Sequence, residues 1–205
     1  MSSSQTLIAG SGISSSLGGS FTGTTWTSPG NITASDNTYA SVTLNGTSAI
    51  SSECLVAQDF GFEINGMATI LGIVVNVERK ASANGYIRDN AVYLIKNGNY
   101  HGNNKSVGTY WTTTEADAVY GSPTDLWGSS LLPEDIRSPT FGFMIQATYQ
   151  NAYFTPATAY VDAIEMTIYY EQPKIYYGTT EVKRIFFGSS EVRKVAYGST
   201  VLPSQ

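Results

Sequence analysis

The sequence predicts an all-β protein: an antiparallel, jelly-roll-like β-sandwich with an extended N-terminal arm and a C-terminal β-meander of ten-residue repeats. Three observations support this fold class. Apolar and polar side chains alternate over several segments, as they do in half-buried strands. Turn-forming dipeptides such as Asn-Gly separate these segments. No window of a dozen residues repeats its apolar positions with the period of a helix.

The chain has 205 residues, which is enough for one β domain of ordinary size plus an appendage. Charged residues make up only 13% of it, against about 25% in a typical globular protein. Residues 1–170 carry 6 basic and 13 acidic groups, whereas residues 171–205 carry 5 basic and 3 acidic groups, so the C-terminal segment is mildly basic. The net charge of −5 gives no general reason to expect nucleic-acid binding.

We expect three parts along the chain. Residues 1–25 are rich in Ser, Gly and Thr and predict an extended arm, ordered mainly where it lies against another surface. Residues 26–171 predict the β-sandwich, with about eight antiparallel strands. The strongest predicted strands are at 71–77, 141–147 and 164–170, and the weaker ones at 39–44, 54–58, 60–64 and 87–95. One helical turn is expected at 132–136, with Pro133 near its start.

Residues 172–205 predict a strand-repeat docking tail. Gly178, Gly188 and Gly198 fall ten residues apart, each after an apolar or aromatic group and before a Ser or Thr pair. A unit of this length can form one strand and one tight turn, so strands are expected at 181–187 and 191–197. Such units bury almost nothing alone, and their aromatic side chains need another surface. The residues expected to mediate assembly are Tyr176, Tyr177, Ile185, Phe186, Phe187, Val195 and Tyr197.

Little in the sequence favours catalysis or a metal cofactor. His101 is the sole histidine, and a Ser–His–Asp triad or a zinc site would have to use it; an exposed loop position is the simpler interpretation. Cys54 is the sole cysteine, which excludes an intrachain disulfide and favours a reducing compartment. A glycosidase would need two carboxylates across a cleft, which sequence alone does not show. We therefore expect no enzyme and no cofactor.

Two features leave alternatives open. Asp36-Asn37 and Asp89-Asn90 could offer oxygen ligands to calcium, but Asp at such places more often caps a turn. Trp111 and Trp127 could expose rings that stack on a glycan, but a loop tryptophan more often fills the end of a sandwich core. The N-terminus lacks a signal-peptide pattern, and no apolar stretch is long enough to span a bilayer, so we expect cytoplasmic synthesis without membrane insertion.

The body of the chain resembles a β-sandwich module found in tailed-bacteriophage virion proteins and in some bacterial surface proteins. The resemblance spans about residues 26–170. It rests on the order of the fragments Trp26-Thr-Ser-Pro-Gly-Asn-Ile32, Asp36-Asn-Thr-Tyr-Ala40, Phe60-Gly-Phe62, Ile70-Leu-Gly-Ile73, Glu78-Arg-Lys80, Ile87-Arg-Asp-Asn-Ala-Val-Tyr-Leu94, Asp125-Leu-Trp-Gly128, Phe141-Gly-Phe143 and Val161-Asp-Ala-Ile-Glu-Met-Thr-Ile-Tyr-Tyr170. The tail resembles the Tyr-Gly-Ser/Thr-Thr-Glu-Val repeats that end phage tail and other virion proteins.

The resemblance implies a structural or adhesive role and brings no catalytic residues. We expect a non-enzymatic virion structural protein, tail-associated as a fibre or adaptor, made in the host bacterial cytoplasm and assembled through its terminal segments. The alternatives are a capsid decoration (cement) protein and a glycan-binding module for receptor recognition. A polysaccharide depolymerase is disfavoured. The expected partners are other virion proteins, copies of the same chain in a trimer, and, for the glycan-binding alternative, a host surface glycan.

Overall fold

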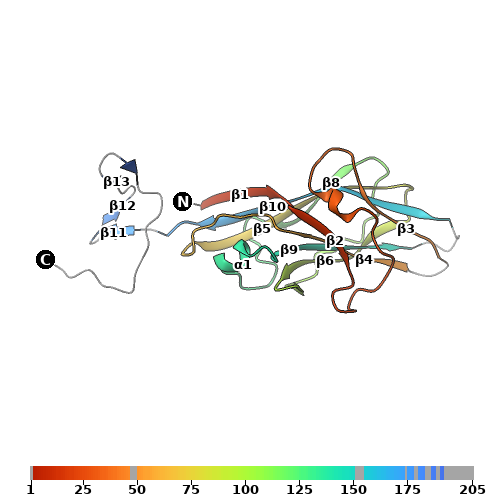
Figure 1. Cartoon of the computed structure of the whole chain (residues 1–205), viewed down its shortest axis with the longest axis horizontal. Coiled ribbons are helices and arrows are strands. Elements are labelled where there is room, and N and C mark those ends of the chain that lie inside the picture. The colour runs from red at the N-terminus through yellow and green to blue at the C-terminus, as the bar shows by residue number, and fades with distance from the viewer. Residues whose placement is uncertain are drawn as a thin grey trace. The chain divides into compact units, whose positions relative to one another are not determined.

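The computed structural model describes residues 2–46, 50–150 and 155–173, and the backbone of four short strands beyond them. The chain divides into two compact units, Met1–Gln172 and Pro173–Gln205. The first unit is the β-sandwich, and most of its strands are labelled in Figure 1. The division follows Gln172, one residue beyond the predicted end of the sandwich.

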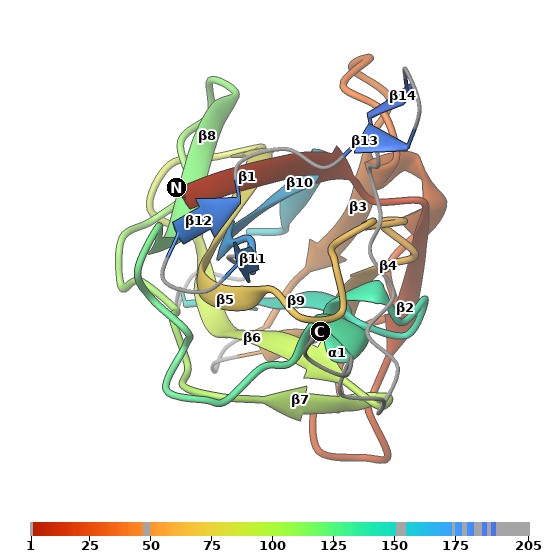
Figure 2. The same ribbon diagram turned by 90° about the vertical axis from the view of Figure 1, so that its left-hand side faces the viewer.

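The sandwich consists of two five-stranded sheets in which all neighbouring strands are antiparallel. The first sheet contains β1 (Ser2–Ile8), β3 (Ala40–Leu44), β10 (Ala157–Glu171), β5 (Thr69–Ala81) and β8 (Ala116–Ser122). The second contains β2 (Ser11–Ser15), β4 (Ile50–Gln58), β9 (Gly142–Tyr149), β6 (Ile87–Lys96) and β7 (Asn99–His101). Figure 2 looks along the strands, with β1 and β10 in one layer and β6 and β7 in the other.

The strand order confirms the jelly-roll-like prediction. The strands from β3 to β10 lie in the order β3-β10-β5-β8 in one sheet and β4-β9-β6-β7 in the other. The chain therefore crosses between the sheets after β3, β4, β5, β7, β8 and β9, which is the double Greek key of a jelly roll. The crossings bring segments that are far apart in sequence into the same core.

Most of the predicted elements are present. The three strongest predicted strands coincide with parts of β5, β9 and β10, and three of the weaker ones with parts of β3, β4 and β6, to within one residue at their starts. The expected helical turn is α1 (Pro133–Arg137), with the proline at its first position. A 3-10 turn, η1 (Pro29–Ile32), precedes β3. The sequence did not predict β7 and β8.

The predicted strand at 60–64 is wrong. This segment has no strand pairing, although Phe60 and Phe62 are buried and their rings stack at 5.7 Å between centroids. Asp59 and Gly61 have positive φ angles, 58° and 75°, which interrupt an extended chain. The alternation of apolar residues here comes from an irregular loop that lays two aromatic side chains on the core.

Residues 1–25, which the sequence predicts as an extended arm lying against another surface, contribute two strands to the sandwich. β1 pairs with the C-terminal half of β10, from Ser2 opposite Glu171 to Ile8 opposite Glu165, and β2 pairs with β4. The chain turns from one sheet to the other at Gly10, where a Cβ would collide with the carbonyl oxygen of Asp59. Ser- and Gly-rich segments have weak strand propensity, but backbone hydrogen bonds to an existing strand need no apolar side chain.

A β-bulge changes the core-facing positions of β10. Ala159 and Val161 face the core at odd positions, whereas Ile164 and Met166 face it at even positions. The register with β5 shifts between Val161 and Ala163, which adds one residue to β10 at that point. The extra residue is Asp162, whose relative exposure is 0%.

The end of the core is filled by Trp127, which is fully buried with a φ of 59°. Its indole N–H donates to the carbonyl oxygen of Ile73 at 3.1 Å, and its ring lies edge-on to Phe143. Gly121, with a φ of 80°, passes so close that a Cβ would collide with the Ile73 carbonyl oxygen and lie 2.7 Å from the indole nitrogen. Only glycine fits at this position.

The described residues of the second unit form two short hairpins. β11 (Ile175–Tyr177) pairs with β12 (Thr180–Val182), and β13 (Phe186–Phe187) pairs with β14 (Ser190–Glu191). Each pair is a two-stranded sheet of its own. The predicted strand at 181–187 is described only at its ends, which belong to different hairpins; most of the predicted strand at 191–197 lies outside the described residues.

We predict that Gly121→Ala destabilises the sandwich by about 2–4 kcal/mol, because it adds backbone strain and a steric clash beside Trp127. Urea unfolding followed by tryptophan fluorescence measures this change. Gly108→Ala is the matched control, because a Cβ at Gly108 meets no atom within 4 Å. Equal midpoints for the two variants would show that the close packing at Gly121 contributes nothing.

Candidate functional site: the Arg79–Asp89 pair and its pocket

Asp89 is a buried carboxylate in the middle of the sandwich. It lies on β6 at a second bulge, where the register with β9 shifts between Asp89 and Ala91. Its side chain is 0% exposed. An isolated buried carboxylate would be strongly unfavourable, so its partners determine what this position can do.

Four donors surround the two oxygens of Asp89. Oδ1 accepts hydrogen bonds from Arg79 Nη1 and, at 2.8 Å, from Trp111 Nε1. Oδ2 accepts from Tyr120 Oη at 2.9 Å and from the backbone N–H of Val107 at 3.2 Å. These donors come from β5, β8 and the segment before β8, so Asp89 links both sheets and a long connection.

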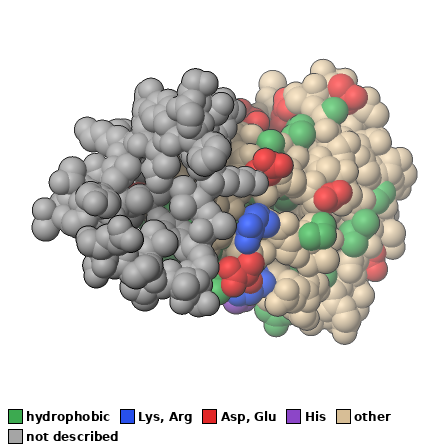
Figure 3. Space-filling model, turned by 60° about the vertical axis from the view of Figure 1, so that its left-hand side comes forward, with side chains coloured by type: hydrophobic (Ala, Val, Ile, Leu, Met, Phe, Trp, Pro, Cys, Tyr) green, Lys and Arg blue, Asp and Glu red, His purple; other side chains and the backbone are tan. Residues whose placement is uncertain are grey.

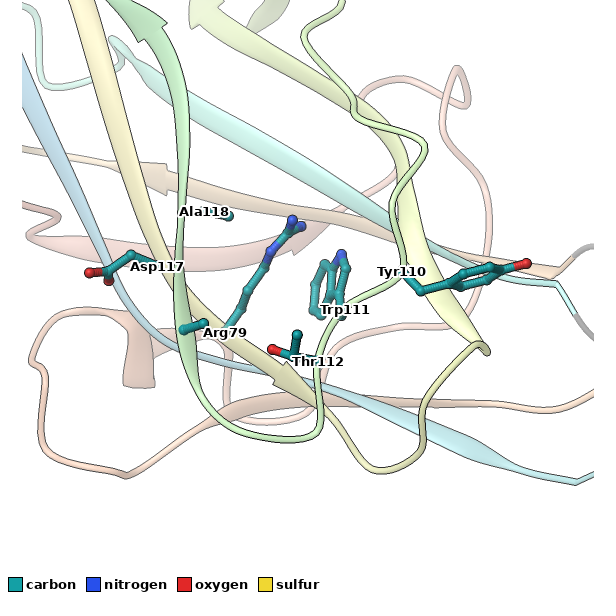
Figure 4. A pocket seen from close by; sticks show the side chains of 7 residues that line it. Arg79, Tyr110, Trp111, Thr112, Asp117 and Ala118 are labelled. Carbon is teal, nitrogen blue, oxygen red and sulfur yellow. The ribbon is translucent and has the colours of Figure 1, made fainter.

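Arg79 is held between aromatic rings. Its guanidinium carbon lies 4.4 Å from the ring centroid of Trp111 and 5.7 Å from that of Tyr120. Figure 4 shows the guanidinium group and the Trp111 ring side by side. A planar, weakly hydrated cation suits such a site, because it can stack on rings and bond a carboxylate at the same time.

A small pocket of about 120 Å³ lies over this pair. Its lining consists of Arg79, Tyr110, Trp111, Thr112, Ala116, Asp117 and Ala118. Tyr110 and Asp117 point away from the guanidinium group in Figure 4. Ligand pockets usually measure about 300–1,000 Å³, so this one admits at most a few water molecules or a very small group.

The groups around this pocket are arranged for structure rather than proton transfer. The Arg79 charge is compensated by Asp89, and both carboxylate oxygens have partners. Burial raises the pKa of Tyr120 well above its usual value, so its hydroxyl remains a donor to Asp89. The arrangement crosslinks the core.

Trp111 and Trp127, the possible glycan contacts, are both buried. Trp111 is 3% exposed and Trp127 is 0% exposed, so neither offers a ring face to a glycan in this structure. The favoured interpretation, a tryptophan that fills the core, describes Trp127. Trp127 donates its backbone N–H to Asp125. Burial of the Asp125 carboxyl raises its pKa, but the hydrogen bonds from Lys105 and Trp127 outweigh burial, so the pKa of Asp125 is lowered overall.

The two Asp-Asn pairs lie in different surroundings. Asp89 contacts an arginine, which does not fit a cation site. Asp36 is exposed, and its Oδ1 accepts the Thr38 backbone N–H at 2.9 Å, as in a turn cap. Asn37 donates its backbone N–H to Asp162 Oδ2 at 3.0 Å.

The sole histidine and cysteine also lie apart from any reactive arrangement. His101 is on β7 and partly buried, not in an exposed loop, and its Nε2 is buried with no hydrogen-bond partner among the described residues. Cys54 is fully buried on β4, and burial raises the pKa of its thiol to about 12. A thiol of this kind is an unreactive core group.

The predicted assembly residues of the tail are only partly described. Tyr176 and Tyr177 lie on β11, and Phe186 and Phe187 lie on β13, where the backbone alone is described. The remaining residues, Ile185, Val195 and Tyr197, lie outside the described residues. Their role in assembly stays a prediction.

The sequence carries one signal for the Arg79 site, in the apolar pattern of β5. Ile73, Val75 and Val77 predict that odd positions of β5 face the core, and continuing the pattern places Arg79 there as well. A charged residue at a core position indicates a buried partner. The partner itself, Asp89, could not be identified, because the bulge in β6 depends on pairing with a distant strand.

On the face drawn in Figure 3, apolar side chains of the described residues are scattered among polar ones rather than gathered into a patch. Single exposed apolar residues are normal on soluble surfaces. Within the described residues, no helix is both long enough and apolar enough to cross a membrane.

No protein-family model matches the sequence, and no curated protein is similar to it. Among solved structures, a CBM4 protein is similar with a TM-score of 0.35 and 12% identity over 78% of this chain and 92% of that one. A chain of the cyanophage Pam1 capsid aligns with a TM-score of 0.27 and 13% identity over 66% of this chain and 82% of that one. A chain of the infectious bursal disease virus Gx strain structure aligns with a TM-score of 0.30 and 11% identity over 83% of this chain and 36% of that one. These TM-scores are too low to assign a function.

We predict that Arg79→Met destabilises the protein by about 3–5 kcal/mol, because it leaves Asp89 buried without a compensating charge. Arg88→Met, one residue before Asp89 and outside the pair, is the control and should cost far less. In a double-mutant cycle, Arg79→Met with Asp89→Asn should be less destabilising than the sum of the single changes. Urea unfolding measures the four proteins of the cycle and the control, and additive effects would mean that the two side chains do not act as a pair.

Proposed function

We propose that this chain is a non-enzymatic structural protein of a tailed-bacteriophage virion, a tail-associated fibre or adaptor component that assembles through its C-terminal repeats. The observation that carries the proposal is the pair of hairpins in the second unit, with strands of two or three residues. The resemblance of the body and the tail to modules of tailed-phage virion proteins supports the same assignment.

The hairpins support assembly because they are too small to be stable alone. A two-stranded hairpin is at best marginally stable in water, and these strands are shorter than the usual ~5–6 residues. Their sequences contain Tyr176, Tyr177, Phe186 and Phe187, which would gain most from burial against a partner surface. Addition of such strands to an exposed sheet edge is an established mode of protein recognition. The proposed partners are neighbouring virion proteins and copies of the same chain, arranged as a trimer.

Both N-terminal strands are paired within the sandwich, which favours the tail as the segment that mediates assembly. Ser2 pairs with Glu171, so the first strand is engaged within the sandwich up to the point where the second unit begins. β2 is likewise engaged with β4. β1 and β2 thus already have partners in their own chain, whereas each hairpin of the second unit pairs only within itself among the described residues.

The body supports a scaffold role rather than catalysis. The buried charged pair in its core is fully partnered, and the pocket above it is small. The thiol of Cys54 is buried with a raised pKa. These properties favour a stable module that projects from a particle or covers part of one.

The test compares the full chain with a variant that ends at Gln172. We expect the truncated protein to keep the unfolding temperature of the sandwich, because Met1–Gln172 is a compact unit with its own core. It should lose self-association, measured by light scattering after size-exclusion chromatography, and it should fail to join particles in a complementation assay. Truncated protein that still forms the oligomer and enters particles would contradict the proposal.

The same assay separates tail attachment from the capsid-decoration alternative. Full-length protein carrying an affinity label can be located on intact particles by electron microscopy. Label at the tail supports the proposal, and label distributed over the capsid supports a cement role. In both cases, exchanging Phe186 and Phe187 for Ser should weaken attachment, because both aromatic residues lie in a repeat hairpin.

A second candidate function is glycan recognition, favoured by an aromatic cluster on the second sheet. Ring centroids of Phe21 and Tyr93 lie 5.2 and 5.3 Å from that of Tyr100, and Tyr100 is 46% exposed. An exposed ring supported by other rings is the arrangement that stacks on sugars. We expect Tyr100→Ala to abolish any binding to host polysaccharide in a glycan array. Tyr110→Ala removes an equally exposed tyrosine, 44%, outside the cluster and should leave binding unchanged. Equal binding by both variants would exclude this surface.

A further inference from the structure

Three carboxylates from distant parts of the chain meet on the outer side of the first sheet. They belong to Glu78 on β5, Glu115 immediately before β8, and Asp162 at the bulge of β10. One oxygen from each lies within 4.8 Å of the other two. We propose that these three residues bind a divalent cation, with calcium as the best fit.

Asp162 provides an observation that is independent of the clustering. Its relative exposure is 0%, and its Oδ2 accepts the backbone N–H of Asn37 at 3.0 Å. Its Oδ1 is buried and has no hydrogen-bond partner among the described residues. A buried carboxylate oxygen without a donor is costly, and a bound ion is one of the few arrangements that would satisfy it.

The bulge in β10 explains why this carboxylate is here. The register runs from Val161 opposite Arg79 to Ala163 opposite Glu78, so Asp162 is the extra residue beside Glu78. Bulges redirect side chains, and they often occur next to functional sites. The loop before β3 covers this position, with Thr33 bridging to Ala163. Asp162 is therefore held by backbone contacts on two sides.

The local charge is only partly compensated. Glu115 Oε2 is also buried without a hydrogen-bond partner in the described part of the chain, and the ammonium nitrogen of Lys80 lies 3.7 Å from it. Lys80 donates to Tyr39 Oη at 2.6 Å and lies over that ring, so its position is set by the tyrosine. Three carboxylates and one ammonium leave a formal charge of −3 + 1 = −2. One divalent cation would neutralise it.

The ligand set selects the kind of ion. Carboxylate oxygens favour hard cations, and the cluster contains no histidine or cysteine that would favour zinc. Calcium binds oxygen at about 2.3–2.6 Å, so two ligands on opposite sides of it are about 4.6–5.2 Å apart. The limit of 4.8 Å on the three oxygens is compatible with that spacing. Magnesium demands a smaller and more regular octahedron. Glu78 and Glu115 are only partly buried, which leaves room for water ligands.

A cation here would act on stability. It would tie β5, β10 and the segment before β8 together on the face opposite the core, and it would fix the loop around Asn37 through Asp162. The inference does not depend on the proposed function, because it concerns the sandwich alone.

The test uses the full-length protein after removal of metal with EDTA. We expect about 5 mM CaCl₂ to raise the unfolding temperature by roughly 3–6 °C, and MgCl₂ to raise it less. NaCl at the same ionic strength controls for charge screening and should not reproduce the effect. Isothermal titration of CaCl₂ should show one binding site.

Asp162→Asn and Glu78→Gln should each remove most of the calcium-dependent rise. Glu165→Gln, which makes the same change of charge at an exposed position of β10, should retain it. Without calcium, Asp162→Asn should unfold at the same or a higher temperature, because it keeps the acceptor for Asn37 and removes repulsion. The proposal is overturned if calcium neither binds nor stabilises the wild-type protein, or if the rise survives in both cluster variants.

Discussion

The sandwich depends on one long strand, β10. It pairs with β5 along almost its whole length, while its other edge pairs with β3 in the first half and with β1 in the second. One strand from the end of the body therefore organises a sheet whose other members come from its start and middle. The bulge at Asp162 allows both halves of β10 to face the core although the chain gains one residue between them.

The neighbouring residues Glu78 and Arg79 show how the two faces of β5 handle charge. Arg79 points into the core, where Asp89 and two aromatic rings satisfy its guanidinium group. Glu78 lies on the opposite face, beside two further carboxylates, each with a buried oxygen that accepts no hydrogen bond from the described residues. The inward charge is compensated by the protein itself, and we attribute the outward imbalance to a cation. A period of two along one strand thus separates a structural ion pair from a proposed binding site.

The sandwich body and the repeat unit differ in how completely they bury their aromatic side chains and pair their strands among the described residues. In the body, aromatic residues such as Trp111 and Trp127 are buried and their indole N–H groups have acceptors. In the second unit, strands of two or three residues pair only as isolated hairpins among the described residues. This contrast is the physical basis for proposing a folded module that joins a larger assembly through its C-terminal repeats. Because both tryptophans are buried, the candidate glycan surface is the exposed ring of Tyr100.

The sequence by itself determined the fold class, because the alternation of apolar and polar residues along a strand does not depend on which strand it pairs with. It placed β5, β9 and β10, the single turn of α1, and the ten-residue spacing of the tail. It also contained the core-facing position of Arg79. It did not determine that Ser-rich β1 and β2 belong to the sheets, since backbone pairing leaves little mark on side-chain pattern. Only the tertiary structure decided which tryptophans are buried and which carboxylates meet, because burial and proximity depend on the register between strands that lie far apart in the chain.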